Sequence, residues 1–152
     1  MKVVLFADLH PALVAFPIAL ISLAGVLELL ALLNLAPQAR LAARYNLLAA
    51  AIFAIFAYLS GSLAAEGVTK GEELIERAIG DHFLGAKISL FLLLPTVVFR
   101  VVGDSAEQGR RLFGSLYAFF LVGTIAALLY TAWLGGRLVF GHAVGVVVQA
   151  LY

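Results

Sequence analysis

Three histidines are the residues of this chain best suited to bind a metal or a cofactor. His10 begins a long apolar run and is followed by Pro11, His82 begins another run, and His142 follows the last one. Neutral imidazole nitrogens bind haem iron, zinc and copper. The chain has no cysteine, which excludes disulfides, thiolate metal sites, iron–sulfur clusters and covalently attached c-type haem. Any metal or haem chemistry is therefore expected at the histidines.

The composition is that of a membrane protein. Of the 152 residues 64% are hydrophobic and 12% are charged, and the mean hydropathy is +1.08. A soluble domain has about a quarter of its residues charged. The net charge of +1 gives no reason to expect a nucleic-acid partner. We expect the lipid bilayer to surround the chain.

Four apolar runs are long enough to cross a hydrocarbon core, which takes about 20 residues. They cover residues 11–36, 45–65, 82–102 and 112–136. The first run is too long for the apolar region of a cleaved signal peptide, which favours a span instead. Short connections predict antiparallel neighbours. The expected fold is therefore an all-α integral membrane protein, an antiparallel four-helix transmembrane bundle that forms one domain over residues 1–152.

Two further segments are expected to lie at the membrane surface. The connection before His82 is acidic, and we expect Glu72, Glu73 and Glu76 to open one or two interfacial helical turns. Gly135 and Gly136 are expected to turn the chain. The short C-terminal segment that follows them would then lie on the membrane surface.

This topology brings the three histidines to one surface. The first and third runs start there, and the fourth run returns to it. Pro11 suits the first helical position, which places His10 just outside the first turn. His10 and His82 at equal depth on two helices are what bis-histidine ligation of a b-type haem requires. His142 is the alternative ligand, or a residue that orients another ligand.

Two cations fit the haem hypothesis, and two other interpretations of the histidines are open. Arg137 and Lys87 lie on the same surface and are expected to bind haem propionates. Alternatively, the three histidines form a zinc or copper site. Each histidine is otherwise an interfacial polar residue that water or the backbone satisfies.

Three stretches of the chain resemble a known family. They are "HPALVAFPIAL" near the start, "DHFLGAKISLFLLL" in the middle and "GGRLVFGHAVGV" near the end, and they are similar to domain-of-unknown-function family 2231, small predicted membrane proteins. Family members typically read His-Pro-x-x-Val-His-Phe-Pro-Ile, whereas this chain has Ala15 at the second histidine. If the family binds two metal centres, one ligand is missing here. The family's association with c-type cytochromes or Rieske domains implies an electron-transfer role.

Glu28 is the one carboxylate expected well inside a span. We expect it to be a protonated acid that holds two helices together, with a proton path or a quinone contact as the alternative. Tyr117 lies at a similar depth and is expected to share a hydrogen bond with it. The small residues Ala50, Ala54, Ala57 and Gly61 form one stripe, which predicts a helix-packing seam.

Positive charges in short loops predict the orientation. Five arginines are expected in the first and third loops, at positions 40, 44, 100, 110 and 111. Their concentration favours a cytoplasmic location for these loops. Both termini and the histidines would then be extracytoplasmic, in a prokaryotic plasma membrane.

The sequence has no motif for hydrolysis, phosphate binding or zinc proteolysis. We therefore expect an electron carrier or a subunit of a complex, with no catalytic residue, in place of a stand-alone enzyme. The favoured function is an electron-transfer subunit that passes electrons between quinone and a surface redox protein. The alternative is a non-catalytic structural or assembly subunit of a larger respiratory-type membrane complex. Partner subunits or a homo-oligomer are expected in both cases.

Overall fold

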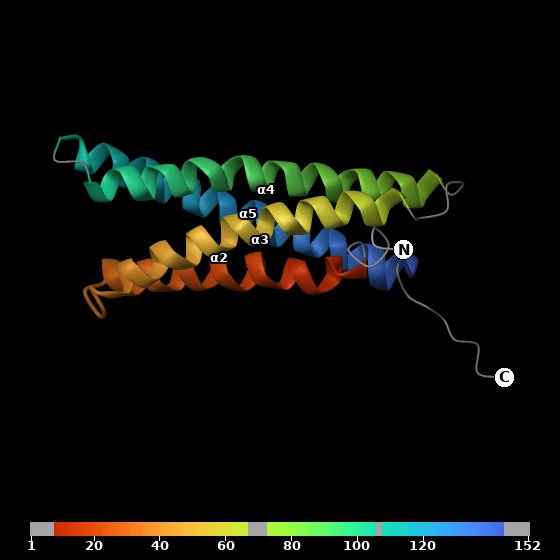
Figure 1. The fold of residues 1–152 in the computed structure, drawn as a ribbon, viewed down its shortest axis with the longest axis horizontal. Helices are drawn as coiled ribbons and strands as arrows, with labels where there is room; N and C mark the ends of the chain where they lie inside the picture. Colours follow the sequence, from red (N-terminus) through yellow and green to blue (C-terminus); the bar gives the residue numbers. More distant parts are fainter. Residues whose placement is uncertain (1–7, 67–72, 106–107, 145–152) are drawn as a thin grey trace.

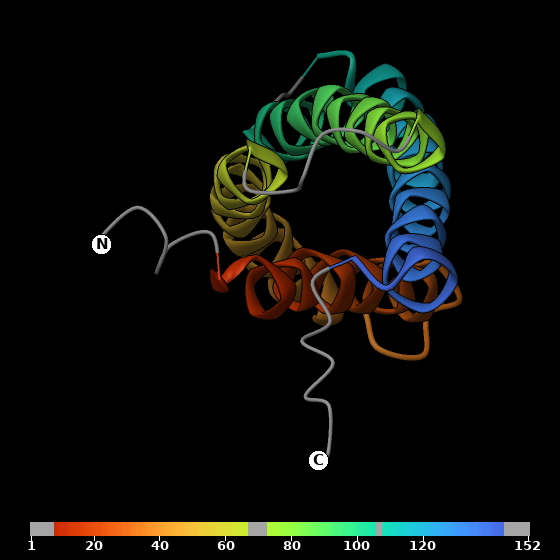
Figure 2. The same ribbon diagram turned by 90° about the vertical axis from the view of Figure 1, so that its right-hand side faces the viewer.

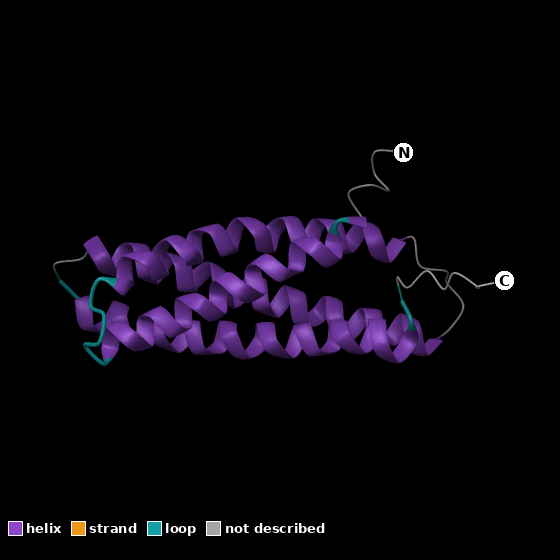
Figure 3. Ribbon diagram, turned by 90° about the horizontal axis from the view of Figure 1, so that it is seen from below, coloured by secondary structure: helices purple, strands orange, loops and turns teal. Residues whose placement is uncertain are grey.

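The chain folds into an all-helical bundle. The computed structural model describes residues 8–66, 73–105 and 108–144. Within these ranges it contains four helices and no strand (Figures 1 and 3). The helices are α2 (His10–Leu32), α3 (Ala39–Glu66), α4 (Glu73–Ser105) and α5 (Arg110–His142). Each is long and apolar enough to cross a membrane, which confirms the predicted fold class.

The helices are arranged as two hairpins. Seen end-on, they occupy the four corners of a square in chain order (Figure 2). Contacts are extensive between α2 and α3 and between α4 and α5, and much sparser between α3 and α4 and between α2 and α5. The parallel helices α2 and α4 therefore lie diagonally opposite, and so do α3 and α5. The two hairpins meet along two loosely packed seams.

Helix α4 begins earlier than the sequence predicted. It starts at Glu73 and continues through His82, so the helical turns expected at Glu73 and Glu76 are present and are continuous with the span; Glu72 lies outside the described residues. Glu73 and Glu76 occupy the first turn of α4, where a negative charge is favourable at the positive end of the helix dipole. With 33 residues, α4 is about 50 Å long and extends beyond the hydrocarbon core.

Helix α5 continues through the two glycines that were expected to turn the chain. It ends at His142, and Ala143 follows with a left-handed φ of 51°. The predicted turn at Gly135 and Gly136 is therefore wrong. Residues 137–142 are helical, and residues 145–152 of the expected surface segment lie outside the described residues. Gly135 has a packing role, described below.

The first span is shorter than predicted, and the arginines are less confined to loops. Helix α2 ends at Leu32, and Asn34 adopts a left-handed φ of 57°. Arg40 and Arg44 lie in the first turns of α3. Arg100 lies inside α4, with a side chain that is 11% exposed. Arg100 is therefore not one of the loop charges from which the orientation was predicted.

The interiors of the two hairpins differ in chemistry. Between α4 and α5, Ser89 and Thr131 are joined by a hydroxyl contact of 3.1 Å, and Thr96 and Thr124 by one of 2.9 Å. Such hydrogen bonds between helices stabilise bundles in lipid, where no water competes. Between α2 and α3 the interior is built on alanines, and the predicted stripe supplies two buried ones, Ala50 and Ala57.

The two hairpins repeat one another. Residues 72 apart in α2 and α4, and 74 apart in α3 and α5, occupy corresponding positions. These offsets match buried residues with buried residues: Ile21 with Leu93, Ala24 with Thr96, Leu47 with Leu121, Ala50 with Thr124 and Ala57 with Thr131. They also relate His10 to His82 and Glu28 to Arg100. Since α2 and α4 are parallel, the hairpins are related by an approximate two-fold axis along the bundle.

An ion pair joins the two hairpins at the end opposite the histidines. Glu28 Oε1 lies 3.1 Å from a guanidinium nitrogen of Arg100, and their side chains are 16% and 11% exposed. Arg100 also lies 3.4 Å from Asp104, donates a hydrogen bond of 2.9 Å to the Arg40 carbonyl and covers the Tyr117 ring at 5.2 Å. The Tyr117 hydroxyl is buried without an aligned hydrogen-bond partner among the described residues. Tyr117 therefore lies against both members of the pair: Arg100 covers its ring, and its hydroxyl is close to the Glu28 carboxylate, as expected, without an aligned hydrogen bond.

We expect the substitution Arg100→Leu to lower the free energy of unfolding by about 3 kcal/mol, because it leaves the Glu28 carboxylate buried without its partner. Glu28→Leu costs less, since Arg100 keeps Asp104 and the Arg40 carbonyl. The double variant is expected to be more stable than Arg100→Leu alone. Unfolding in mixed micelles measures this. Arg77→Leu, which removes an exposed pair with Glu73, is the control. A double variant as unstable as the sum of the two single variants would contradict the interpretation.

Candidate histidine site

Two histidines meet between the hairpins. His10 is the first residue of α2 and His82 is the tenth residue of α4, in its third turn. The two rings are half-buried. Their ring centroids are 6.4 Å apart, and the ring planes cross at 79°. The predicted convergence of these two residues is therefore present, on the diagonal of the bundle. Pro11 follows His10 inside the first turn, so His10 is one position further into the helix than predicted.

The imidazole of His10 is held by the neighbouring helix of its own hairpin. Its Nδ1 atom lies 3.0 Å from the carbonyl oxygen of Ala57 and 3.2 Å from the hydroxyl of Ser60. Ser60 itself donates to the same carbonyl at 3.0 Å. Because a carbonyl oxygen can only accept, Nδ1 carries the proton and donates it. The Nε2 atom of His10 then has a free lone pair.

His82 is held in the same way. Its Nδ1 atom donates to the carbonyl oxygen of Thr131 on α5 at 3.0 Å. Thr131 corresponds to Ala57 under the two-fold relation of the hairpins. Neither His10 nor His82 forms a hydrogen bond through Nε2 with another described residue. An Nδ1–H bond to a backbone carbonyl is the arrangement that fixes the tautomer and orientation of metal-binding histidines.

Two glycines leave room for the two rings. A Cβ atom on Gly61 would lie 2.7 Å from Cε1 of His10, and a Cβ atom on Gly135 would lie 3.0 Å from Cε1 of His82. Each glycine lies four residues after the carbonyl that its histidine contacts, one helical turn along. The same carbonyl-and-glycine cradle therefore occurs once in each hairpin. The predicted small-residue seam at Gly61 serves the histidine as well as helix packing.

The pair has the spacing of two ligands on one metal ion. Two imidazoles that bind a metal from opposite sides, each at about 2.0–2.1 Å, have ring centroids roughly 6 Å apart. The observed separation is 6.4 Å. The donor set of two neutral imidazoles, each with a free Nε2, also suits a b-type haem. The residues present therefore fit an ion or haem iron held between the two helices.

His142 is not brought to this pair. It is the last residue of α5, seven residues beyond Gly135, which corresponds to about 10 Å along the helix. Within the part of the chain that the structure describes, no group of three or more His, Cys, Asp or Glu residues is placed to hold a metal ion. The three-histidine zinc or copper site therefore has no geometric support in the described residues.

Lys87 and Arg137 lie at the histidine end but outside the bundle. Both side chains are exposed. The amine of Lys87 lies 5.2 Å from the centre of the Phe83 ring, and the guanidinium of Arg137 lies 5.0 Å from the centre of the Trp133 ring. Each cation therefore covers an aromatic residue four positions earlier on its own helix. Their binding of propionates stays a prediction.

Ala15 lies on the exposed face of α2. A histidine there, as in the family pattern, would point away from the pair formed by His10 and His82. Sequence reasoning missed the two carbonyls and the second glycine of the cradle. It also missed that Arg100 is the partner of Glu28. The signal was present, because Arg100 follows His82 by 18 residues and Glu28 follows His10 by the same number.

We expect Gly135→Ala to displace the His82 ring from the Thr131 carbonyl, because the added methyl group would overlap Cε1. The cost in unfolding free energy is about 1–3 kcal/mol. Nitrogen-15 NMR of labelled histidine measures the Nδ1–H bond directly. The neighbouring Gly136→Ala is the matched control, since a Cβ there meets nothing within 4 Å. Identical histidine spectra for the two variants would contradict the cradle.

Comparison with known proteins identifies a family without an assigned function. The family model described as "Predicted membrane protein (DUF2231)" matches residues 7–148. No curated protein and no solved structure shows a significant match. The matched range contains all four helices and all three histidines.

Proposed function

The chain belongs to the DUF2231 family of predicted membrane proteins, and we propose that it is an electron-transfer subunit that holds one b-type haem between His10 and His82. The observation that carries the proposal is the histidine pair itself. Two imidazoles on parallel helices stand 6.4 Å apart, and each is anchored through Nδ1 to a backbone carbonyl. Haem, when bound, supplies a one-electron redox centre.

The residues of the chain have three tasks in this proposal. The carbonyls of Ala57 and Thr131 orient the imidazoles and raise their basicity. Gly61 and Gly135 give the rings space. Without a bound group, the two Nε2 atoms are acceptors with no donor among the described residues. A bound haem iron would accept these lone pairs.

The position of the pair determines where electrons enter and leave. His10 and Glu28 are 18 residues apart on α2, about 27 Å along the helix. A centre at the histidine end is therefore far from the opposite membrane surface. Quinone in the membrane and a redox protein at the histidine surface are the proposed partners, with His142, Arg137 and Lys87 at that same surface. A structural or assembly role in a larger complex is the alternative.

A pyridine haemochrome spectrum of the protein, purified after expression with ample haem, tests the proposal. We expect one haem in the wild type and loss of most of it in His10→Ala and in His82→Ala, because each variant removes an axial ligand. His142→Ala is the matched control and is expected to keep its haem.

Absence of haem from the wild type would overturn the proposed function and leave the structural role. Full retention of haem in both His10→Ala and His82→Ala would overturn the assignment of the ligands. Loss of haem in His142→Ala alone would make His142 the ligand.

We propose that the histidine end faces the extracytoplasmic side of a prokaryotic plasma membrane, since Arg40, Arg44, Arg110 and Arg111 gather at the other end. The chain has no cysteine, so single-cysteine variants report the orientation directly. An impermeant maleimide is expected to label Asp8→Cys in intact cells, and Gln108→Cys only after permeabilisation. The reverse pattern would invert the orientation.

A further inference from the structure

The polar contacts that tie the two hairpins together are gathered at one end of the bundle. The ion pair of Glu28 with Arg100 joins α2 to α4. Arg44 of α3 lies 3.4 Å from Asp104 of α4. The guanidinium of Arg100 covers the ring of Tyr117 on α5 at 5.2 Å. All four helices therefore contribute to this cluster, whose place in the bundle we call the arginine end.

The buried apolar core lies in the same half of the bundle. It takes residues from all four helices: Ile21, Ala24, Ala43, Leu47, Ala50, Leu93, Tyr117 and Leu121. On α2 and α4 it begins eleven residues beyond the histidines, from 10 to 21 and from 82 to 93, which is about 16 Å along each helix. Helices α2 and α5 also approach closely in this half, since a Cβ on Gly25 would lie 2.7 Å from the Ile125 side chain. The two hairpins therefore share one core at the arginine end.

The histidine end is held differently. Each imidazole donates to a carbonyl of its own hairpin. The hydrogen bonds and ion pairs that cross between the hairpins in the described residues all lie at the arginine end. At the histidine end the hairpins meet through rings, with centroids 6.4 Å apart for His10 and His82 and 5.0 Å apart for Tyr58 and Phe83. No described polar bond therefore holds the two histidines together.

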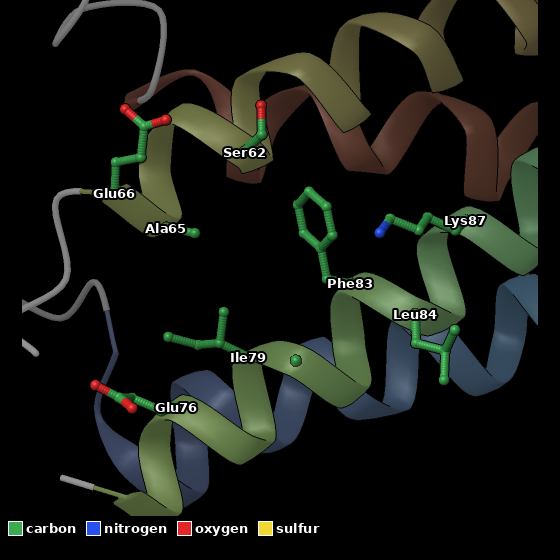
Figure 4. Close-up of a pocket in the computed structure, with 9 residues that line it drawn as sticks. Ser62, Ala65, Glu66, Glu76, Ile79, Phe83, Leu84 and Lys87 are labelled. Carbon is green, nitrogen blue, oxygen red and sulfur yellow. The ribbon is translucent and has the colours of Figure 1, made fainter.

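A groove also separates the hairpins at the histidine end. It lies between the end of α3 and the beginning of α4, has a volume of about 510 Å³, and is lined by residues that include Ala65, Ile79 and Leu84. Figure 4 shows Phe83 reaching from α4 towards α3 across this groove. The seam between α3 and α4 is therefore bridged by charged groups at the arginine end and is hollowed at the histidine end.

We propose that the bundle acts as a clamp, in which the hairpins pivot about the arginine end and separate at the histidine end to admit the group that His10 and His82 bind. Each hairpin moves as a rigid body, because contacts within it are extensive and hinge motions keep packed cores intact. The imidazoles lose no hydrogen bond in this motion, since each stays with its own hairpin. The connection of residues 67–72 permits it, because six extended residues span up to about 20 Å.

A small rotation is enough to open the site. His10 and Glu28 are 18 residues apart on α2, which makes a lever of about 27 Å. A rotation of about 10° on this lever moves the histidine end by roughly 5 Å. This inference rests on the proposed function only for the identity of the admitted group, because the motion itself belongs to the ligand-free protein.

Double electron–electron resonance of spin-labelled protein in lipid nanodiscs tests the clamp. The chain has no cysteine, so label pairs are introduced on an unaltered background. Ala12→Cys/Leu84→Cys reports the histidine end and Val26→Cys/Val98→Cys the arginine end. Both pairs join exposed positions of α2 and α4 that are 72 residues apart, so the labels contribute equally to the two widths.

In the ligand-free protein we expect the histidine-end pair to have the broader distance distribution, by about 4 Å, because Ala12 is 16 residues from Glu28 and Val26 is only two. Addition of haemin is expected to narrow the histidine-end distribution and to leave the arginine-end distribution unchanged. Arg100→Leu is expected to broaden the arginine-end distribution, since it removes the pair that joins α2 to α4. The control Arg77→Leu, which removes an exposed pair within α4, is expected to change neither.

Equal widths for the two label pairs in the ligand-free protein would overturn the clamp, whether or not haem binds. An arginine-end distribution that Arg100→Leu leaves unchanged would overturn the assignment of the pivot. Bound haem is measured by haemochrome on the same samples. Haem that binds without narrowing the histidine-end distribution would contradict closure. Absence of haem would overturn the proposed function alone, since the ligand-free widths decide the clamp independently.

Discussion

The structure depends on one constraint: inside a hydrocarbon layer, each polar group must find its partner within the protein. Four helices satisfy their own backbones, and most of the polar side chains between them are joined to a partner on another helix. Serine and threonine hydroxyls join α4 to α5. Histidine N–H groups donate to carbonyls of the adjacent helix. At the other end, Glu28 and Arg100 neutralise one another across the bundle.

The two-fold relation between the hairpins explains where these pairs occur. Equivalent positions on α2 and α4 face each other across the diagonal. At one end they carry opposite charges, Glu28 and Arg100, and attract directly. At the other end they carry two identical neutral bases, His10 and His82, whose N–H groups are already used by carbonyls. At the charged end the two charges balance one another, whereas the histidine end has two free lone pairs. This asymmetry is why we place the functional site there.

The helices pack more tightly within each hairpin than between the two hairpins. Within each hairpin the small and β-branched residues bring the helices close, as in other membrane bundles. Between the hairpins the two seams are loose. A site between two preformed hairpins binds a ligand from both sides without rearranging either core. The proposed haem site therefore lies in the interface that the repeat creates.

The sequence by itself determined the membrane class, the number of spans and the surface at which His10 and His82 meet. These follow from apolar length and from chain direction, which are local or topological properties. It misplaced the start of α4 and the end of α5. Acidic residues and glycines usually mark the surface or a turn, but a long helix accommodates both. It also placed Arg100 in a loop, since a charged residue taken by itself predicts a solvent-exposed position.

Only the tertiary structure decided which partner each polar residue has. The carbonyls of Ala57 and Thr131 carry no signal in the sequence, because every residue has a carbonyl and packing selects one. From the sequence, Gly61 indicates a packing stripe and Gly135 a turn. Only the structure shows that they lie against the rings of His10 and His82. His142, equal to the others in the sequence, lies about 10 Å beyond the pair because α5 continues as a helix.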